Sequence, residues 1–304
     1  MGIFYCSSAA ESIRDKIKVG TGANMNNKIE RRAFLLNTAS SAAALCVGSV
    51  GLLSANFASA QVSVQGSRKY GVKALVFDMF GTVLDWRPSV ARESEKILKP
   101  LGYNIDWLEF ATAWRREYDP SMAPIRDGKR PFVVLDVLHR ESLDKVLPKF
   151  GVKDLPEATK KELNFAWHKL DGWPDVTKGM EVLSRNFFLA PCSNGNVAMM
   201  ADIARHNKIR FDSLLGAETA QDYKPKPRVY LQAAEAFGLQ PKEVMMICAA
   251  GHSGDLVAAA AQGLRTGTVA RPNESGPGKG ASVPTVPVDV IANDLNDLSA
   301  KLMA

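Results

Sequence analysis

The chain has 304 residues, of which 46% are hydrophobic and 23% charged, so it can bury a large core and has the composition of an ordinary globular protein. The formal net charge of +6 is modest, and no basic run interleaved with aromatic residues indicates a surface for nucleic acid. Nucleic acid is therefore not expected as a partner.

The first sixty residues are predicted to form a leader. Residues 28–60 run from a basic start through a mildly apolar stretch to small residues at 58–60, which is the order of regions in a secretory signal. Cleavage is expected before Gln61. An uncleaved signal would instead anchor the protein in the membrane.

A pair of arginines in this leader, Arg31-Arg32, resembles a twin-arginine export signal, although Glu30 stands where Ser or Thr is usual. We therefore expect the export machinery as a partner and the periplasm as the destination. Met25 stands just before the signal, so we expect it to be the true start.

From residue 72, short β-rich runs alternate with helical stretches, which predicts an α/β fold with a doubly wound parallel sheet, a Rossmann-like core. Such a sheet places its site at the carboxyl ends of the strands. Strands are expected at 73–78, 187–192, 212–216, 244–249 and 266–270, with a last short strand and helix after residue 288, and helices at 196–207, 226–237 and 254–262.

Between the first two strands no clear strand is found, and the pattern is helical. Within 105–118, the apolar residues fall at spacings of three and four, as in an amphipathic helix. A helical cap is therefore expected at 89–177, inserted between core segments 72–88 and 178–304. Further cap helices are expected at 89–99, 132–147 and 157–170.

Four polar motifs follow or adjoin predicted strands, and the topology would bring them to one edge of the sheet. The first begins with Asp78, a charge at the end of a buried strand, which is costly unless it is paired or hydrogen-bonded. The motifs are Asp78-x-x-Gly81-Thr82, Ser193-Asn194, Lys224-Pro225 and Gly251-His252-Ser253-Gly254-Asp255.

This order of motifs resembles the haloacid dehalogenase superfamily over residues 72–300. Members are hydrolases in which the first Asp forms a covalent intermediate. The resemblance implies that Asp78 is the nucleophile and that Thr82 and backbone amides of the turn keep it ionised.

Most of the superfamily transfers phosphoryl groups with Mg²⁺, and this sequence departs from that pattern twice. Phe80 stands where those enzymes carry a general acid, and Gly251 stands where they carry a metal-binding acid. Mg²⁺ prefers hard oxygen ligands, so a site with one carboxylate fewer would bind it poorly. A phosphatase or another hydrolase of the superfamily remains the alternative, and no metal is expected.

The branch that the chain resembles instead is the type II (S)-2-haloacid dehalogenases. "FDMFGTVLDWR" has their aromatic residue at position 80, and Trp114-Arg115 resembles their halide-binding Arg on an early cap helix. Arg116 competes for this role, but neighbouring residues on a helix point about 100° apart, so only one faces the site.

The resemblance implies an ordered set of roles in opening the carbon–halogen bond of a small 2-halocarboxylate. Asp78 attacks C2 and forms an ester with inversion. Arg115 and Asn194 stabilise the departing halide, and water then hydrolyses the ester with Asp255 as base. No metal or organic cofactor is expected. The substrate carboxylate would be held by Ser193, Lys224 and the amides of Met79 and Phe80.

Two further positions are substrate-binding candidates. Tyr230 matches a family tyrosine near the site, and His252 stands where better-known members have Asn, so it would orient water or Asp255. A homodimer is compatible with the resemblance. A second alternative, from a different functional class, is a non-catalytic protein that binds small carboxylates. Cys192 and Cys248 each close an apolar run and are expected to be buried free thiols.

Overall fold

The computed structural model describes residues 64–304. The predicted signal and the predicted start at Met25 therefore lie outside the described residues. No helix in the described part of the chain combines the length and apolar character needed to cross a bilayer.

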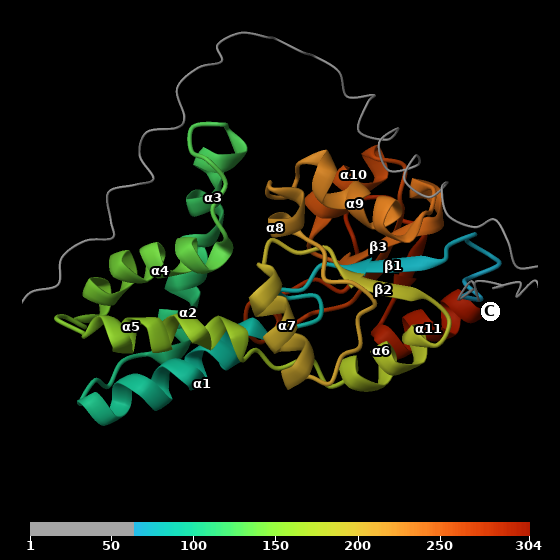
Figure 1. Cartoon of the computed structure of the whole chain (residues 1–304). Helices are drawn as coiled ribbons and strands as arrows, with labels where there is room; N and C mark the ends of the chain where they lie inside the picture. Colours follow the sequence, from blue (N-terminus) through green and yellow to red (C-terminus); the bar gives the residue numbers. More distant parts are fainter. Residues whose placement is uncertain (1–63) are drawn as a thin grey trace, which may run out of the picture. The chain divides into compact units, whose positions relative to one another are not determined.

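Five parallel strands form one sheet in the order β2-β1-β3-β4-β5 (Figure 1). Every neighbouring pair is parallel, which confirms the predicted doubly wound α/β fold. The strands are β1 (Ala74–Phe77), β2 (Phe188–Pro191), β3 (Val244–Ala249), β4 (Arg265–Val269) and β5 (Val290–Ala292).

The prediction of a strand at 212–216 is wrong. The segment does run beside β2, but the Leu189 N–H donates to the Asp212 side chain at 2.9 Å instead of to a main-chain carbonyl. Further along, only an isolated bridge joins Ser193 to Gly216. The side-chain carboxylate thus replaces part of the ladder, and the apolar pair Leu214-Leu215 packs without strand pairing.

Both faces of the sheet are buried, which is why the first strand is a continuous apolar run and not an alternating one. Leu75 and Phe77 point into one cluster, while Ala74 and Val76 point into the other. The first face is covered by α6 (Val176–Ser184) and α11 (Leu295–Met303), and the second by α9 (Pro227–Phe237) and α10 (Ser253–Ala261) (Figure 1). Two more core helices are α7 (Val197–His206) and α8 (Ala217–Ala220), and a short 3₁₀ turn is η5 (Pro241–Glu243).

Helices fill the segment between β1 and β2, as predicted for the cap. They are α1 (Trp86–Leu98), α2 (Trp107–Arg116), α3 (Tyr118–Arg126), α4 (Leu135–Val146) and α5 (Glu157–Asn164), with 3₁₀ turns η2 (Lys99–Leu101), η3 (Leu147–Phe150) and η4 (Phe165–His168). The helix expected at 105–118 ends at Arg116, and the one expected at 157–170 becomes a 3₁₀ turn at Phe165. The domain boundaries at 88 and 177 stay predictions.

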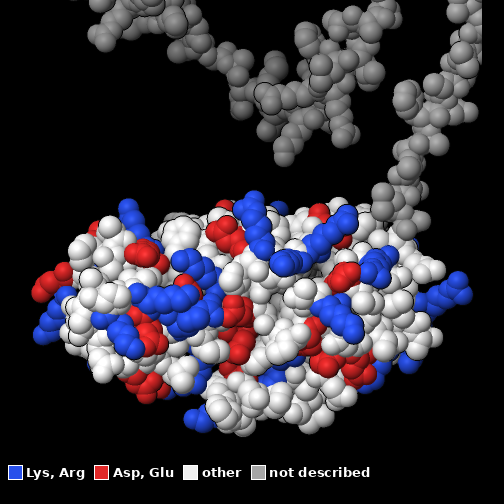
Figure 2. Space-filling model, turned by 90° about the horizontal axis from the view of Figure 1, so that it is seen from below, with Lys and Arg blue, Asp and Glu red and all other residues white. Residues whose placement is uncertain are grey.

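The surface carries mixed charge. Figure 2 shows Lys and Arg intermingled with Asp and Glu over the visible face, with no continuous basic stripe on it. Cys192 and Cys248 are both buried and free, which confirms the expectation for these two thiols.

The carboxylate of Asp85 lies where the chain passes from the core into α1. The Asp85 backbone N–H donates to the Asp171 carbonyl at 2.9 Å, in the segment where the chain returns from the cap to the core. Burial, followed by the nearby charge of Asp171, raises the pKa of Asp85 to about 6. Ionising Asp85 therefore costs more free energy in the folded protein than in the unfolded chain.

We expect Asp85→Asn to stabilise the protein above about pH 6 and to leave it unchanged near pH 4. The protonated carboxyl is favoured in the folded state, and this contribution is present below the unfolded pKa and lost as the pH rises through about 6. Because the Asp85 side chain is only partly buried, the expected gain in the free energy of unfolding is about 1 kcal/mol, which corresponds to a Tm rise of about 3 °C. Thermal unfolding at both pH values measures it, and a lower Tm for the variant at pH 8 would contradict this account.

Candidate active site

The four predicted motifs converge at the carboxyl edge of the sheet. Asp78 follows β1, Asn194 follows β2, His252 follows β3, and Asp255 lies in the first turn of α10. Together with Lys224 they line a cavity of 390 Å³. The parallel topology explains this convergence, since every β-strand ends at the same edge.

Asp78 is buried and accepts three charged or polar contacts. Lys224 Nζ lies 2.7 Å from Oδ1, while Thr82 Oγ1 and His252 Nδ1 lie 2.7 and 2.9 Å from Oδ2. Burial alone would raise the pKa of Asp78, but Lys224 and His252 more than offset it and lower the pKa well below its usual value. Asp78 is therefore ionised and buried, as the nucleophile predicted from the sequence requires.

The hydroxyl of Thr82 has a fixed direction. Its Oγ1 accepts the Ala249 N–H of β3 at 2.6 Å, so its own hydrogen is free to point at Asp78. The predicted role of Thr82 in holding the nucleophile agrees with this geometry. The contact also ties the turn after β1 to the neighbouring strand.

Lys224 bridges two carboxylates. Its Nζ lies 2.7 Å from Asp78 Oδ1 and 2.6 Å from Asp255 Oδ2, and the Tyr230 hydroxyl donates to Asp255 Oδ1 at 2.8 Å. Burial disfavours the ammonium, but the two carboxylates raise the pKa of Lys224 well above its usual value. Asp78, His252 and Asp255 have the spacing of a metal-binding group. The Lys224 ammonium lies at hydrogen-bond distance from two of these three groups, Asp78 and Asp255.

The His252 side chain makes no hydrogen bond with the Asp255 side chain, one of the partners expected for it, but joins Asp78 to Glu274. Its Nδ1 lies 2.9 Å from Asp78 Oδ2 and its Nε2 lies 2.8 Å from Glu274 Oε1. Burial lowers the pKa of His252, but the two carboxylates outweigh burial and raise it to about 10. His252 is therefore an imidazolium between the carboxylates of Asp78 and Glu274.

Glu274 is the site residue that sequence reasoning missed. It comes from the Pro/Gly-rich segment after β4, where no local pattern indicates a functional group. Gly81 makes room for it: φ is +90°, and a Cβ at this position would collide with the Glu274 carboxylate. The glycine of the first motif therefore serves both the turn and the passage of Glu274 to His252.

The cap contributes the other wall of the cavity through Arg115, Tyr118, Asp119, Met122 and Arg126. The Arg115 guanidinium stacks 3.7 Å from the Tyr118 ring centre, and its Nη1 is buried without a hydrogen-bond partner. Arg116 points away, is 67% exposed and pairs with Glu109 at 2.7 Å. Of the two arginines, Arg115 thus lines the cavity.

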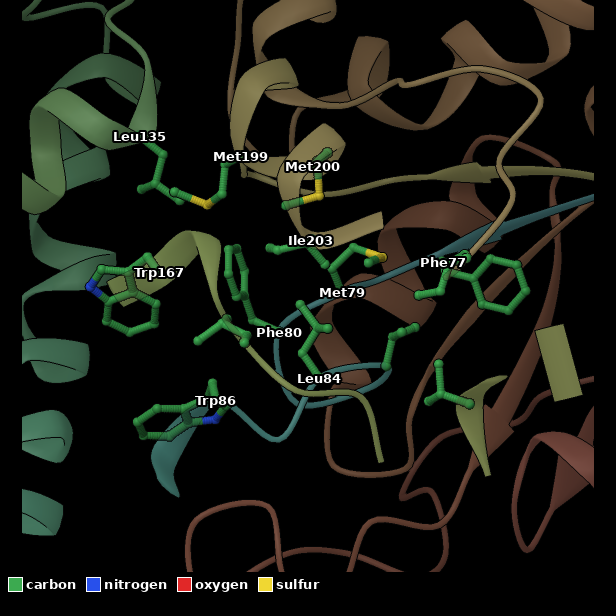
Figure 3. Packing of buried hydrophobic residues seen from close by; sticks show 14 of the residues in the cluster. Phe77, Met79, Phe80, Leu84, Trp86, Leu135, Trp167, Met199, Met200 and Ile203 are labelled. Carbon is green, nitrogen blue, oxygen red and sulfur yellow. The ribbon is translucent and has the colours of Figure 1, made fainter. Parts of the chain in front are cut away.

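Several predicted residues lie behind the cavity instead of lining it. Ser193 is fully buried and its Oγ accepts the Gly195 N–H at 3.0 Å. The ring centre of Phe80 lies 6.0 Å from that of Tyr118 and 6.0 Å from that of Trp167. Met79 is buried in the same core as Phe80 and Trp167 (Figure 3). Contacts of Ser193, Tyr230, Met79 and Phe80 with a substrate stay predictions.

Residues 72–247 match the family described as haloacid dehalogenase-like hydrolases. The chain belongs to this family. It is 40% identical to a defluorinating L-2-haloacid dehalogenase of known crystal structure, with a TM-score of 0.75 over 78% of this chain and 98% of that one. A second L-2-haloacid dehalogenase structure is 41% identical, with a TM-score of 0.72 over 76% and 98% of the two chains.

Among curated relatives of this hydrolase, (S)-2-haloacid dehalogenase 4A of Burkholderia cepacia is 29% identical over 199 residues. The match covers 64% of this chain and 81% of the relative. The family and the superfamily resemblance deduced from the motifs therefore agree.

Proposed function

We propose that this hydrolase removes halide from short (S)-2-haloacids and releases (R)-2-hydroxyacids through an aspartyl-ester intermediate, without a cofactor. The observation that carries the proposal is that an ionised Asp78 from the core and the guanidinium of Arg115 from the cap line the same cavity. Phe80, which has no proton to give, occupies the position of the phosphatase acid.

In the first half-reaction an oxygen of Asp78 attacks C2 of the substrate from behind the carbon–halogen bond. A C–O bond forms, the C–X bond breaks, and the halide leaves with the bonding electron pair, which inverts C2. Arg115, whose buried Nη1 has no hydrogen-bond partner, and Asn194 both line this cavity and would stabilise the departing anion. Lys224 offers its ammonium to the substrate carboxylate.

In the second half-reaction water attacks the carboxyl carbon of Asp78. The bond from that carbon to the ester oxygen, which came from Asp78 and is now joined to C2, breaks. The hydroxyacid leaves with that oxygen after it takes up a proton, and the oxygen of water stays in the regenerated carboxylate. The attacking water must lose a proton to a base. Two groups compete for this role. Asp255 is the base expected from the family resemblance, and the His252–Glu274 pair is the second candidate.

The loss of the negative charge of Asp78 on ester formation supports the His252–Glu274 pair as the base. The negative charge of Asp78 is a main reason that the pKa of His252 is raised. Esterification removes that charge, so the pKa of His252 falls and the imidazole becomes able to accept a proton. Glu274, 2.8 Å from Nε2, would then stabilise the imidazolium that forms. Asp255 already accepts from both Lys224 and Tyr230.

We expect Arg115→Lys to lower kcat/KM for halide release by about 10²-fold, because an ammonium cannot stack on Tyr118 as the planar guanidinium does and has fewer donors for the halide. Arg116→Lys is the matched control on the same helix and should leave kcat/KM unchanged. Steady-state kinetics on both variants decides this, and equal effects of the two substitutions would contradict the assignment.

The proposed function is tested by halide release from (S)- and (R)-2-chloropropionate by the full chain in EDTA. Release from the S form alone supports it. Release from neither enantiomer overturns it and returns the lead to a superfamily phosphatase, to be assayed on phosphate esters with Mg²⁺. A protein that forms the Asp78 ester and never hydrolyses it would instead be the non-catalytic carboxylate binder.

We also propose that the leader directs export to the periplasm. The support is the Arg31-Arg32 pair and the order of regions in the sequence. Cell fractionation of the natural protein beside a double substitution, Arg31→Lys with Arg32→Lys, tests it: the wild type should reach the periplasm and the variant should stay inside. A homodimer stays a prediction, and sedimentation of the purified protein measures it.

A further inference from the structure

The seam between cap and core contains a buried histidine with a carboxylate on each ring nitrogen. His168, at the end of η4 in the cap, is 4% exposed. Its Nδ1 lies 2.8 Å from Asp202 Oδ2 of core helix α7, and its Nε2 lies 3.0 Å from Asp136 Oδ1 of cap helix α4. One imidazole ring thus joins two cap segments to the core.

A second contact crosses the same seam. Asn196, at the start of α7, donates its Nδ2 to the other oxygen of Asp136 at 2.8 Å. Apolar packing continues the contact, since Leu135 of α4 and Met199 of α7 belong to the same buried cluster and lie close together in Figure 3. The seam therefore has an apolar part and a charged part.

The charged part requires a particular protonation state. A neutral imidazole has one N–H and one lone pair, so it donates to only one carboxylate. With a carboxylate oxygen at hydrogen-bond distance from both nitrogens, only the imidazolium satisfies both contacts. A neutral ring would turn a lone pair toward a carboxylate oxygen in a buried place, which is unfavourable.

The hydrogen bonds of His168 and Asp136 are connected to the active site on both the core side and the cap side. Asn196 lies two residues after Asn194, whose side chain lines the cavity. On the cap side, Trp167 directly precedes His168 and packs against the ring of Phe80, two residues from the nucleophile (Figure 3). A change in the seam would therefore move η4 and the loop after β2 relative to each other.

We propose that His168, held as an imidazolium between Asp136 of the cap and Asp202 of the core, is a positioning residue that keeps the cap closed over the active site. It contacts none of the reacting atoms. Its effect on substrate binding rests on the proposed function, whereas its effect on cap closure can be measured in the protein alone.

The groups around the ring determine how this contact depends on pH. From α4 it faces Asp136 and, further back, His139, whose pKa burial and nearby cations lower well below its usual value, so His139 stays neutral. From α7 it faces Asp202, which Arg205 approaches to 3.6 Å. Burial lowers the pKa of His168, but Asp136 and Asp202 outweigh burial and raise it. The contact of His168 with Asp136 and Asp202, here called the latch, is thus fully formed below about pH 6.5, the pKa of an unfolded histidine. It is lost as pH rises through the higher pKa that His168 has in the folded protein.

Hydrogen exchange in the unliganded protein tests cap closure directly. After correction for intrinsic rates, amides of η4 and of the first turn of α7 should exchange about tenfold more slowly near pH 6 than near pH 9 in the wild type. His168→Gln, which keeps one donor but no charge, should exchange at the fast rate at both pH values. His206→Gln is the matched control, because His206 lies on α7, the helix that carries Asp202, and pairs with a different carboxylate, Asp171.

Kinetics provide the second readout. KM for a 2-haloacid should rise about tenfold between the same pH values in the wild type, and His168→Gln should have the high KM throughout, with kcat less affected. Asp202→Asn should weaken the pH step, because an amide oxygen can accept from a neutral ring. Wild-type exchange rates and KM profiles in His168→Gln overturn the latch, and so does an equal effect of His206→Gln. Absence of halide release in all proteins refutes the proposed function, and hydrogen exchange then decides the latch alone.

Discussion

Asp78→Asn is expected to lower halide release from an (S)-2-haloacid by a factor on the order of 10⁴ or more, because an amide is not a nucleophile toward C2. The neighbouring Lys224, Thr82 and His252 remain in place, so the cavity keeps its shape. Halide release followed over hours, with intact-protein mass measured for the ester, checks both the rate and the missing intermediate.

The control for this substitution is Asp127→Asn, which removes a surface carboxylate paired with Lys129. It should have wild-type activity and stability. Asp78→Asn leaves buried Lys224 with Asp255 as its remaining carboxylate partner, so its Tm is expected to fall. Substantial release by Asp78→Asn, with no conversion of Asn back to Asp in its mass, would show that another group attacks the substrate.

His252→Phe is expected to separate the two half-reactions. Alkylation of Asp78 still occurs, since Thr82 and Lys224 hold the carboxylate, but the ester loses its base. We expect one equivalent of halide in a burst, followed by turnover slower by about 10²- to 10³-fold. Rapid-quench halide measurement and the mass of the accumulated ester detect this.

The pH dependence provides a separate check on His252. In the ester the charge of Asp78 is gone, so the pKa of His252 falls below about 10, and hydrolysis by the wild type should accelerate as pH rises through the lowered value. This limb should be absent in His252→Phe. Glu274→Gln should keep the limb at a lower rate, because the neutral amide stabilises the imidazolium less. If Asp255→Asn accumulates the ester and His252→Phe does not, the base is Asp255.

Much of the catalytic constellation could be read from the sequence because it depends on local order along the chain. A buried run ending on Asp78, a glycine and Thr82 in the following turn, and later motifs spaced by β-α units all predict one edge of a parallel sheet. Helical geometry predicted that only one of Arg115 and Arg116 faces the site. The structure shows that it is Arg115. Periodicity also predicted the cap helices, although α2 and α5 ended earlier than expected.

The contacts that tune the chemistry were decided only by the tertiary structure. Glu274 reaches His252 from an irregular loop, and His168 meets Asp136 and Asp202 across a seam between segments far apart in the sequence. The strand expected at 212–216 failed for a related reason, since a side-chain carboxylate displaced part of the ladder. Sequence periodicity reports which face of an element is buried. It carries no information on which distant charge a buried histidine will meet, and that meeting is what determines its protonation.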